Sequence, residues 1–100
     1  MPTKTGAGWH FSCAHKDPIR AEIHGHTYEV IAWWDYALGL DAVTLQEQLK
    51  FVLDKIDHTT LSDDMTRAED IAPFIGKQLD GCVGIEIFRP SERLFVRWWL

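Results

Sequence analysis

Three histidines stand at positions from which they can bind one metal ion. His24 and His26 flank Gly25 in a strand-like stretch, so their side chains leave the same face about 6–7 Å apart. His15 stands on an earlier strand-like run, and all three imidazoles converge if the two runs pair as a hairpin. Three histidines that leave a fourth position open are typical of catalytic zinc. The alternative is chance polarity on a solvated strand face, because so short a pattern carries little information alone.

Four strand-like runs are available to position these histidines. They cover residues 8–15, 22–35, 82–88 and 94–100. A short loop that contains Pro18 joins the first two runs, and a turn around Pro90 and Ser91 joins the last two. In the second run His24, His26, Tyr28 and Val30 share one face, as period-two alternation requires.

Two helices are expected between the second and third strands. Capping-box patterns at residues 44–47 and 66–69 each precede apolar residues at helical spacing. The first helix is expected to stop near Asp57. Pro73 lies awkwardly in the second stretch, because proline in a helix interior removes a hydrogen bond and clashes with the preceding turn. We therefore expect this helix to start late or to kink.

The order of these elements predicts an α+β fold, β-β-α-α-β-β, with helices on one face of an antiparallel sheet. A chain of 100 residues makes one domain, residues 1–100. Four strands leave two exposed edges, which favours strand pairing between subunits or barrel closure. Five Trp and five Phe in so short a chain also suggest that other subunits cover some of them. Isolated surface aromatic residues are the alternative.

Charge and composition exclude several classes of partner. The formal net charge is −5 without any run of like charge, so broad electrostatic binding to nucleic acid is not expected. No apolar run approaches the ~20 residues that a membrane span needs, and residues 1–8 lack the apolar core of a signal peptide. Cys13 and Cys82 are too few for a disulfide framework, so a reducing cytoplasm is the simplest setting.

Five motifs occur in the order typical of one family. They are Phe-Ser-Cys-Ala-His at 11–15, His-Gly-His-Thr-Tyr at 24–28, Asp-His-Thr-Thr-Leu at 57–61, Ala-Glu-Asp-Ile-Ala at 68–72 and Gly-Ile-Glu at 84–86. From about residue 9 to the end, the chain resembles the 6-pyruvoyl-tetrahydropterin synthase and 6-carboxytetrahydropterin synthase family. The resemblance implies the tunnelling fold (T-fold), in which subunits join their sheets into a barrel. It also implies a homo-oligomer, a trimer or a hexamer, with active sites at subunit interfaces.

The resemblance further implies a cofactor and a reaction. Zinc (Zn2+) would be bound by His15, His24 and His26, and would act as a Lewis acid on side-chain oxygens of the substrate. The substrate would be a reduced pterin triphosphate, typically 7,8-dihydroneopterin triphosphate, from which triphosphate is eliminated. The side-chain conversion would resemble the 6-carboxytetrahydropterin synthase step of deazapurine (queuosine-type) nucleoside synthesis.

The resemblance also implies roles for Asp57, His58 and Glu86. His58, held by Asp57, would carry protons, because imidazole titrates near neutrality and a carboxylate partner sets its tautomer. The alternative is a polar helix terminus, where a cationic histidine is mildly favourable. Glu86 would accept two parallel hydrogen bonds from the amino-pyrimidinone edge of a pterin, with Gly84 leaving room for the ring. An exposed strand glutamate is the alternative.

The sequence departs from the family pattern at the catalytic base. The family's cysteine lies four residues before the first histidine of His-Gly-His, and here that position is Arg20. Glu22, on the same strand face as His24, is one candidate substitute, since some relatives use a glutamate. Cys13 is another, and its alternative role is a small buried core residue.

A second departure is Arg67, which replaces a threonine that helps to hold the pterin in the family. Arg67 could instead meet a phosphate, as could Lys16, Arg20 or Arg89, and a plain surface cation is the alternative.

Three hypotheses remain from the sequence. The first is a zinc-dependent lyase, and the second is a non-catalytic homologue that keeps zinc and binds a pterin- or purine-like ligand. The third is a structural oligomer whose histidines are a metal-stabilised relic. Arg20 favours the second over the first, and the retention of Asp57, His58 and Glu86 together favours the first over the third.

Overall fold

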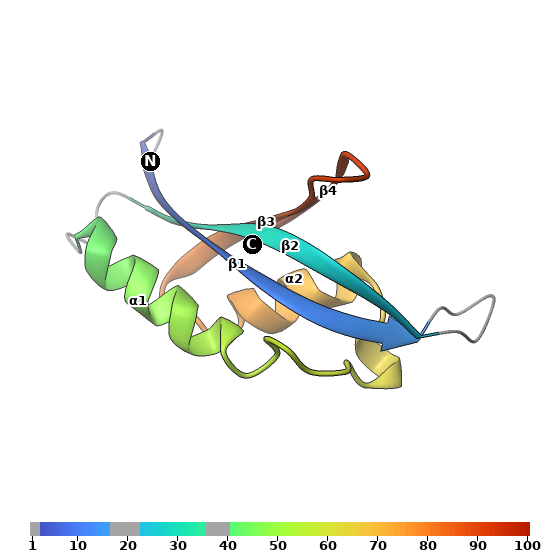
Figure 1. Ribbon diagram of the computed structural model, residues 1–100. Coiled ribbons are helices and arrows are strands. Elements are labelled where there is room, and N and C mark those ends of the chain that lie inside the picture. The colour runs from blue at the N-terminus through green and yellow to red at the C-terminus, as the bar shows by residue number, and fades with distance from the viewer. Residues whose placement is uncertain (1–2, 17–22, 36–40) are drawn as a thin grey trace.

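The chain folds as two strands, two helices and two further strands. A computed structural model describes residues 3–16, 23–35 and 41–100. The elements are β1 (Lys4–Lys16), β2 (Ile23–Asp35), α1 (Ala42–Leu53), the 3-10 turn η2 (Asp63–Met65), α2 (Ala68–Gly76), β3 (Cys82–Arg89) and β4 (Leu94–Trp99) (Figure 1). The predicted β-β-α-α-β-β order is confirmed.

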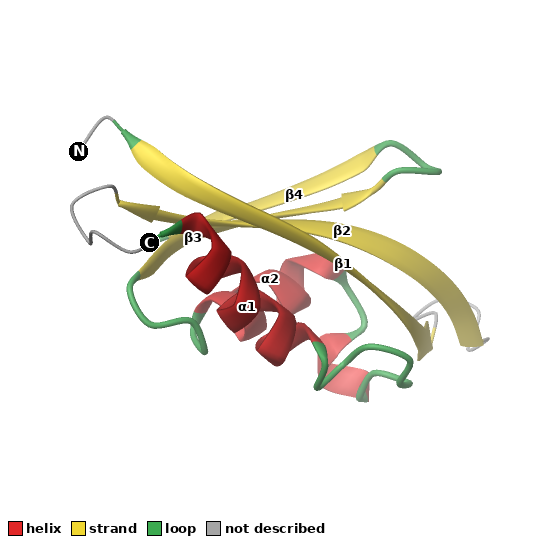
Figure 2. Ribbon diagram, turned by 60° about the vertical axis from the view of Figure 1, so that its left-hand side comes forward, coloured by secondary structure: helices red, strands yellow, loops and turns green. Residues whose placement is uncertain are grey.

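The four strands form one antiparallel sheet in the order β1-β2-β3-β4, and both helices cover the same face of it (Figure 2). β1 and β2 pair over their whole length, from Lys4 opposite Asp35 to Lys16 opposite Ile23. Directly opposed residues in an antiparallel pair point to the same face. This register therefore decides which side chains of the first hairpin lie together.

The core lies between the sheet and the helices. Its buried members come from alternate positions of β1, β2 and β3 and from one face of each helix: Phe11, Tyr28, Val30, Ala32, Trp34, Leu45, Leu49, Val52, Ile71, Ala72, Ile75, Ile85 and Ile87. Val96 and Trp98 of β4 pack against this cluster while partly buried. The strand residues face the helices because apolar residues recur with period two, and this burial is the main stabilising term.

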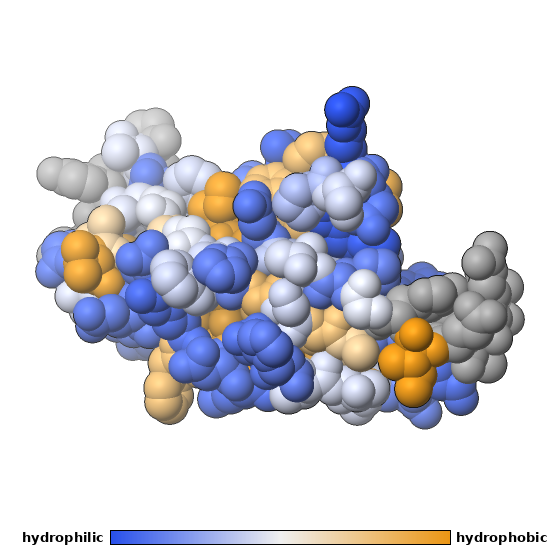
Figure 3. Space-filling view, in the orientation of Figure 1, coloured by the Kyte–Doolittle hydropathy of each residue, from blue (hydrophilic) through white to orange (hydrophobic). Residues whose placement is uncertain are grey.

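The opposite face of the sheet carries a mixture of apolar and charged residues. Trp33, Glu86 and Phe88 lie there, and the β3–β4 register adds Phe95 and Arg97. Phe95 is 65% exposed, and within the described ranges neither helix covers this face. Seen from the side of Figure 1, apolar surface occurs in separate patches among hydrophilic residues (Figure 3).

The helix starts differ from the sequence prediction. α1 is capped by Asp41, whose side chain accepts a hydrogen bond from the Thr44 backbone N–H, so the predicted capping box beginning at Thr44 is wrong. Aspartate is among the strongest N-cap residues, and Thr44 lies inside the first turn. α2 does not start late: it begins at Ala68 and includes Pro73. Burial of Ile71 and Ile75 against the sheet compensates for the hydrogen bond that proline removes.

The first strand starts earlier than predicted, at Lys4 rather than residue 8. Gly6 pairs with Trp33, and a Cβ placed on Gly6 would lie 2.7 Å from a ring carbon of Trp33. The indole covers the backbone at this point, so a glycine of low strand propensity is accommodated in the strand. Among the described helices, none is both long and apolar enough to cross a membrane.

Candidate metal and catalytic site

The end of the first hairpin brings two of the three predicted metal ligands together. The ring centroids of His15 and His26 are 4.8 Å apart. His15 lies opposite His24 in the register, and Cys13 lies opposite His26, so these four positions belong to the helix-covered face. The side chain of His24 lies outside the described part of the chain. Among the side chains that are described, no three metal-ligating residues gather, so a complete ligand set requires His24.

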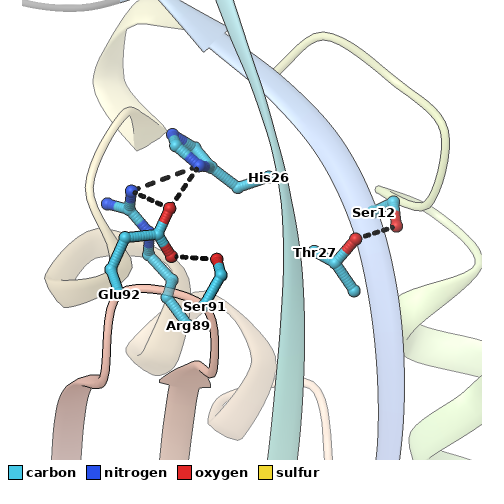
Figure 4. A network of polar contacts seen from close by, with 6 residues as sticks. All are labelled: Ser12, His26, Thr27, Arg89, Ser91 and Glu92. Carbon is cyan, nitrogen blue, oxygen red and sulfur yellow. Dashed lines mark hydrogen bonds and ion pairs between the residues drawn. The ribbon is translucent and has the colours of Figure 1, made fainter.

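The β3–β4 hairpin reaches over to His26. Arg89 Nη2 lies 3.2 Å from His26 Nδ1, and Glu92 Oε1 lies 3.7 Å from the same atom (Figure 4). Arg89 and Glu92 pair at 3.2 Å, and the Ser91 hydroxyl donates to Glu92 at 2.6 Å. The Ser91 hydrogen bond, followed by Arg89, holds the pKa of Glu92 below its ordinary value. An ionised carboxylate and a guanidinium therefore face one nitrogen of a predicted ligand.

This arrangement limits how His26 could bind zinc. A guanidinium can only donate, so when Arg89 donates to Nδ1 the ring proton sits on Nε2, which then has no lone pair for a metal. When Nδ1 instead carries the proton and faces the Glu92 carboxylate 3.7 Å away, Nε2 keeps a lone pair that can bind a metal. A carboxylate commonly supports a histidine ligand from this side. The residues present therefore fit a zinc site when the His26 ring carries its proton on Nδ1, next to Glu92.

Asp57 and His58 form the predicted pair. Asp57 Oδ2 lies 3.0 Å from His58 Nδ1, and Asp57 Oδ1 accepts a hydrogen bond from the Ser12 backbone N–H at 2.8 Å. The Ser12 hydrogen bond, with a smaller contribution from His58, holds the pKa of Asp57 below its ordinary value of 3.8. The His58 side chain is 82% exposed, so its ring is accessible to a ligand.

The edge of β1 fixes where this pair lies. Residues 57–61 run beside it: Thr59 O accepts from Ala14 N at 2.8 Å, and Leu61 N donates to Ala14 O at 2.8 Å. His58 N donates to Ser12 O, and His58 adopts a left-handed backbone with φ of 58°. That conformation is uncommon for a residue with a side chain and is held by these flanking hydrogen bonds. The segment satisfies the free strand edge and fixes the direction of His58.

A groove of about 410 Å3 lies where residues 58–60 meet the first hairpin, and its strand lining consists of Ser12, Cys13, Ala14, Gly25, His26 and Thr27. Because adjacent strand positions point to opposite faces, His26 and Thr27 cannot both direct their side chains into this groove, and the role of His58 as proton carrier stays a prediction. Thr27, the next residue along β2, points to the other side of the sheet, where its hydroxyl meets that of Ser12 at 3.0 Å (Figure 4).

Of the two candidate substitutes for the missing cysteine, Cys13 is described by the structure and Glu22 is not. Cys13 is buried, and burial, followed by the charge of Asp57, raises the pKa of its thiol to about 11. Such a thiol is protonated near neutral pH, as expected of a small core residue. Glu22 and Arg20 lie outside the described residues.

Glu86 is not brought to the histidines within one chain. It lies opposite Ile31 and Arg97 on the sheet face away from the helices, and Arg97 Nε is 3.1 Å from Glu86 Oε1. A Cβ on Gly84 would lie 2.0 Å from a Trp99 ring carbon, so the indole fills the space expected for a flat ligand. The substrate-binding role of Glu86 stays a prediction.

Arg67, in contrast, lies near His15. It is the N-cap residue of α2 and lines a cavity of about 280 Å3 with His15, Tyr28 and Arg89. The sequence suggested Arg67 and Arg89 only as possible phosphate contacts, and it gave no indication of Glu92. The period-two spacing of Ile85, Ile87 and Arg89 was the available signal, because it places Arg89 on the helix-covered face.

The fold and the site define an α+β domain with a histidine cluster at the end of its sheet and an Asp-His pair beside it. The sequence profile of a family described as 6-pyruvoyl tetrahydropterin synthase matches residues 7–98. The chain therefore belongs to that family, which supports a pterin synthase-like function in general. No curated protein matches the chain.

Proposed function

We propose that this protein is a zinc-dependent pterin synthase-like lyase acting on 7,8-dihydroneopterin triphosphate. The observation that carries the proposal is the distance of 4.8 Å between the rings of His15 and His26 in a chain that belongs to the family. The proton carrier that we propose is His58, which pairs with Asp57 beside the edge of β1. Triphosphate elimination with a side-chain conversion of the 6-carboxytetrahydropterin type is the reaction that we propose.

His15, His24 and His26 would hold the metal, and bound zinc supplies Lewis acidity toward side-chain oxygens of the substrate. Glu92 supports the His26 ring from its Nδ1 side. His58 Nδ1 faces Asp57, so Nε2 is the atom that exchanges a proton with the substrate. The low pKa of Asp57 keeps its carboxylate ionised, so it accepts from His58 Nδ1 and orients the ring.

Glu22 is the base that we propose in place of the missing cysteine. It stands two residues before His24 in the sequence, and burial of Cys13 makes the thiol a poor alternative. We retain Arg67 and Glu86 as substrate-binding residues, and Glu86 would act from a neighbouring subunit. The proposed assembly is a homo-oligomer, a trimer or hexamer, located in the cytoplasm and without a nucleic-acid or membrane partner.

A second candidate function is a zinc-containing homologue that binds a pterin- or purine-like ligand without turnover. Two observations favour it. Arg89 lies 3.2 Å from His26 Nδ1, where it competes with the tautomer that zinc needs, and the thiol of Cys13 is buried.

Chromatography of products from 7,8-dihydroneopterin triphosphate separates the two functions. The wild-type protein at substrate-stoichiometric concentration should release triphosphate, and His58→Gln should slow this release by about 10²–10⁴-fold. Glu22→Gln should have a comparable effect, whereas Cys13→Ser should leave the rate within about twofold. His10→Gln, an exposed histidine on the opposite face of β1, is the matched control. Substrate that is bound but recovered unchanged would establish the binding homologue instead.

A further inference from the structure

The helix-free face of the sheet contains a hollow of about 380 Å3 that the proposed reaction does not use. Gly8 lines it with backbone alone, and Ile31 and Phe88 give it apolar walls. Glu29 also lines it, from the position opposite Phe88 in the β2–β3 register. Glu29 and His26 lie three residues apart on β2, so their side chains point to opposite faces of the sheet. The hollow is therefore separate from the histidine cluster.

The hollow exists because Gly8 leaves its position on this face empty. A Cβ on Gly6 or Gly84, two glycines of the same face, would lie 2.7 Å or 2.0 Å from an indole carbon. A Cβ on Gly8 would instead meet the Val30 carbonyl oxygen at 3.5 Å. The Gln46 side chain donates to the Gly8 carbonyl at 3.0 Å and holds the strand backbone here. A ligand can therefore lie directly on the backbone of β1.

Glu29 brings an unpaired carboxylate to this hollow. Two other carboxylates of the same face are paired with cations. Asp35 contacts Lys4 at 2.8 Å. Glu86 contacts Arg97 at 3.1 Å. Glu29 forms neither an ion pair nor a hydrogen bond with any side chain in the described ranges.

Two cationic or ionisable side chains nearby do not occupy Glu29. His10 lies opposite it in the β1–β2 register, but the His10 ring stacks on Trp9 with the centroids 4.8 Å apart. Arg93 lines an adjoining hollow of about 330 Å3 together with Glu29. Within the part of the chain that the structure describes, these two residues form no ion pair. The charge of Glu29 is therefore available to a group from outside the chain.

Phe88 supplies an aromatic surface beside this carboxylate. Its ring meets that of Phe95 edge-on, with centroids 5.2 Å apart and an interplanar angle of 84°. An aromatic face attracts a cation as well as an apolar group. A carboxylate accepts two parallel hydrogen bonds from an amidinium or guanidinium group, and the planar shape of that group suits a site that lies over glycine. The combination favours a planar cation over an anion.

We propose that the hollow over Gly8 binds a planar organic cation, an amidinium or guanidinium group on an apolar body. The charge pairs with Glu29, and the body packs against Ile31 and Phe88. The net charge of −5 assists the approach of such a ligand. A strand added at the β4 edge would extend the sheet without covering β2, so the site is compatible with assembly there. The inference does not depend on the proposed reaction.

Calorimetric titration of the protein as purified tests the proposal with two matched probes. Benzamidine is the planar cation, and benzamide has nearly the same shape without the charge; low ionic strength limits screening. Benzamidine should bind at least tenfold more tightly than benzamide, and Glu29→Gln should remove this difference. Gly8→Val should weaken benzamidine binding about tenfold or more, because its side chain fills the hollow. Glu47→Gln, which neutralises an exposed carboxylate of α1, should leave the affinity unchanged.

Zinc content separates this site from the metal site. Glu29→Gln should retain the zinc of the wild-type protein, because Glu29 points away from His26. Equal affinity for the two probes, or no benzamidine binding at about 10 mM, overturns the inference. Benzamidine binding that either Glu29→Gln or Gly8→Val leaves intact overturns it as well. Wild-type protein that lacks zinc but binds benzamidine through Glu29 would remove the zinc proposal alone.

Discussion

Cys13 and His26 face each other across the first hairpin, yet only the histidine is available for chemistry. Cys13 is 5% exposed, and burial, followed by the charge of Asp57, raises its thiol pKa to about 11. Burial also raises the pKa of Cys82. A thiol can act as a base or nucleophile only as the thiolate, so position in the register is not sufficient for a catalytic role.

Alkylation measures this directly. At pH 8 a thiol with a pKa of about 11 is ionised to about one part in a thousand. We therefore expect iodoacetamide to modify neither cysteine of the folded protein during the time in which it modifies both in urea. Mass spectrometry after a timed quench gives the answer, and fast labelling of Cys13 in the folded protein would contradict it.

At the scale of elements, α2 is held against β4 by one close approach. A Cβ on Gly76 would lie 2.1 Å from a ring carbon of Trp98. Gly76→Ala should therefore lower the free energy of unfolding by about 1–3 kcal/mol through overpacking, measured by urea denaturation. Gly8→Ala is the control, because its nearest contact would be an ordinary 3.5 Å to Val30 O. Equal stability of the two variants would show that the indole moves aside at no cost.

The segment along the β1 edge should respond to acid. Because the Ser12 N–H lowers the pKa of Asp57 in the folded state, its contribution to stability is present above the ordinary value of 3.8. That contribution is lost as the pH falls from 3.8 through the lower pKa that Asp57 has in the folded state. Asp57→Asn should cost about 1 kcal/mol of unfolding free energy at pH 7 and less at pH 3.

Urea unfolding at both pH values tests this, with the exposed Asp54→Asn as control. A constant difference between wild type and Asp57→Asn across the two pH values would mean that the charge of Asp57 does not contribute.

At the scale of the whole molecule, the helix-free face and the β4 edge predict assembly. Phe95 and Trp99 of β4 are 65% and 45% exposed, and the strand has no partner on its outer side among the described strands. Exposed edges and apolar residues of this kind are normally covered. We expect a trimer or hexamer by light scattering, and Phe95→Lys together with Trp99→Lys should shift it to smaller species. A wild-type monomer at micromolar concentration would contradict this expectation.

The parts of the structure that the sequence could predict are those with a local signal. Alternation placed His24 and His26 on one face, and apolar spacing gave both helices. The cap at Asp41 was missed because Thr44–Glu47 mimics a capping box inside the first turn. The contact of Glu92 with His26 depends on how the β3–β4 hairpin lies over β2, which no local pattern encodes. Long-range register decides such contacts.

Zinc content tests the central claim, that three imidazoles at the end of β1 and β2 hold one metal ion. Protein purified without added metal and analysed by mass spectrometry of its metals should contain about one zinc per chain. His24→Gln should reduce this to near zero, and His10→Gln, on the exposed opposite face of β1, should retain it. Wild-type protein without zinc after dialysis against micromolar zinc, or full occupancy in His24→Gln, would contradict the account.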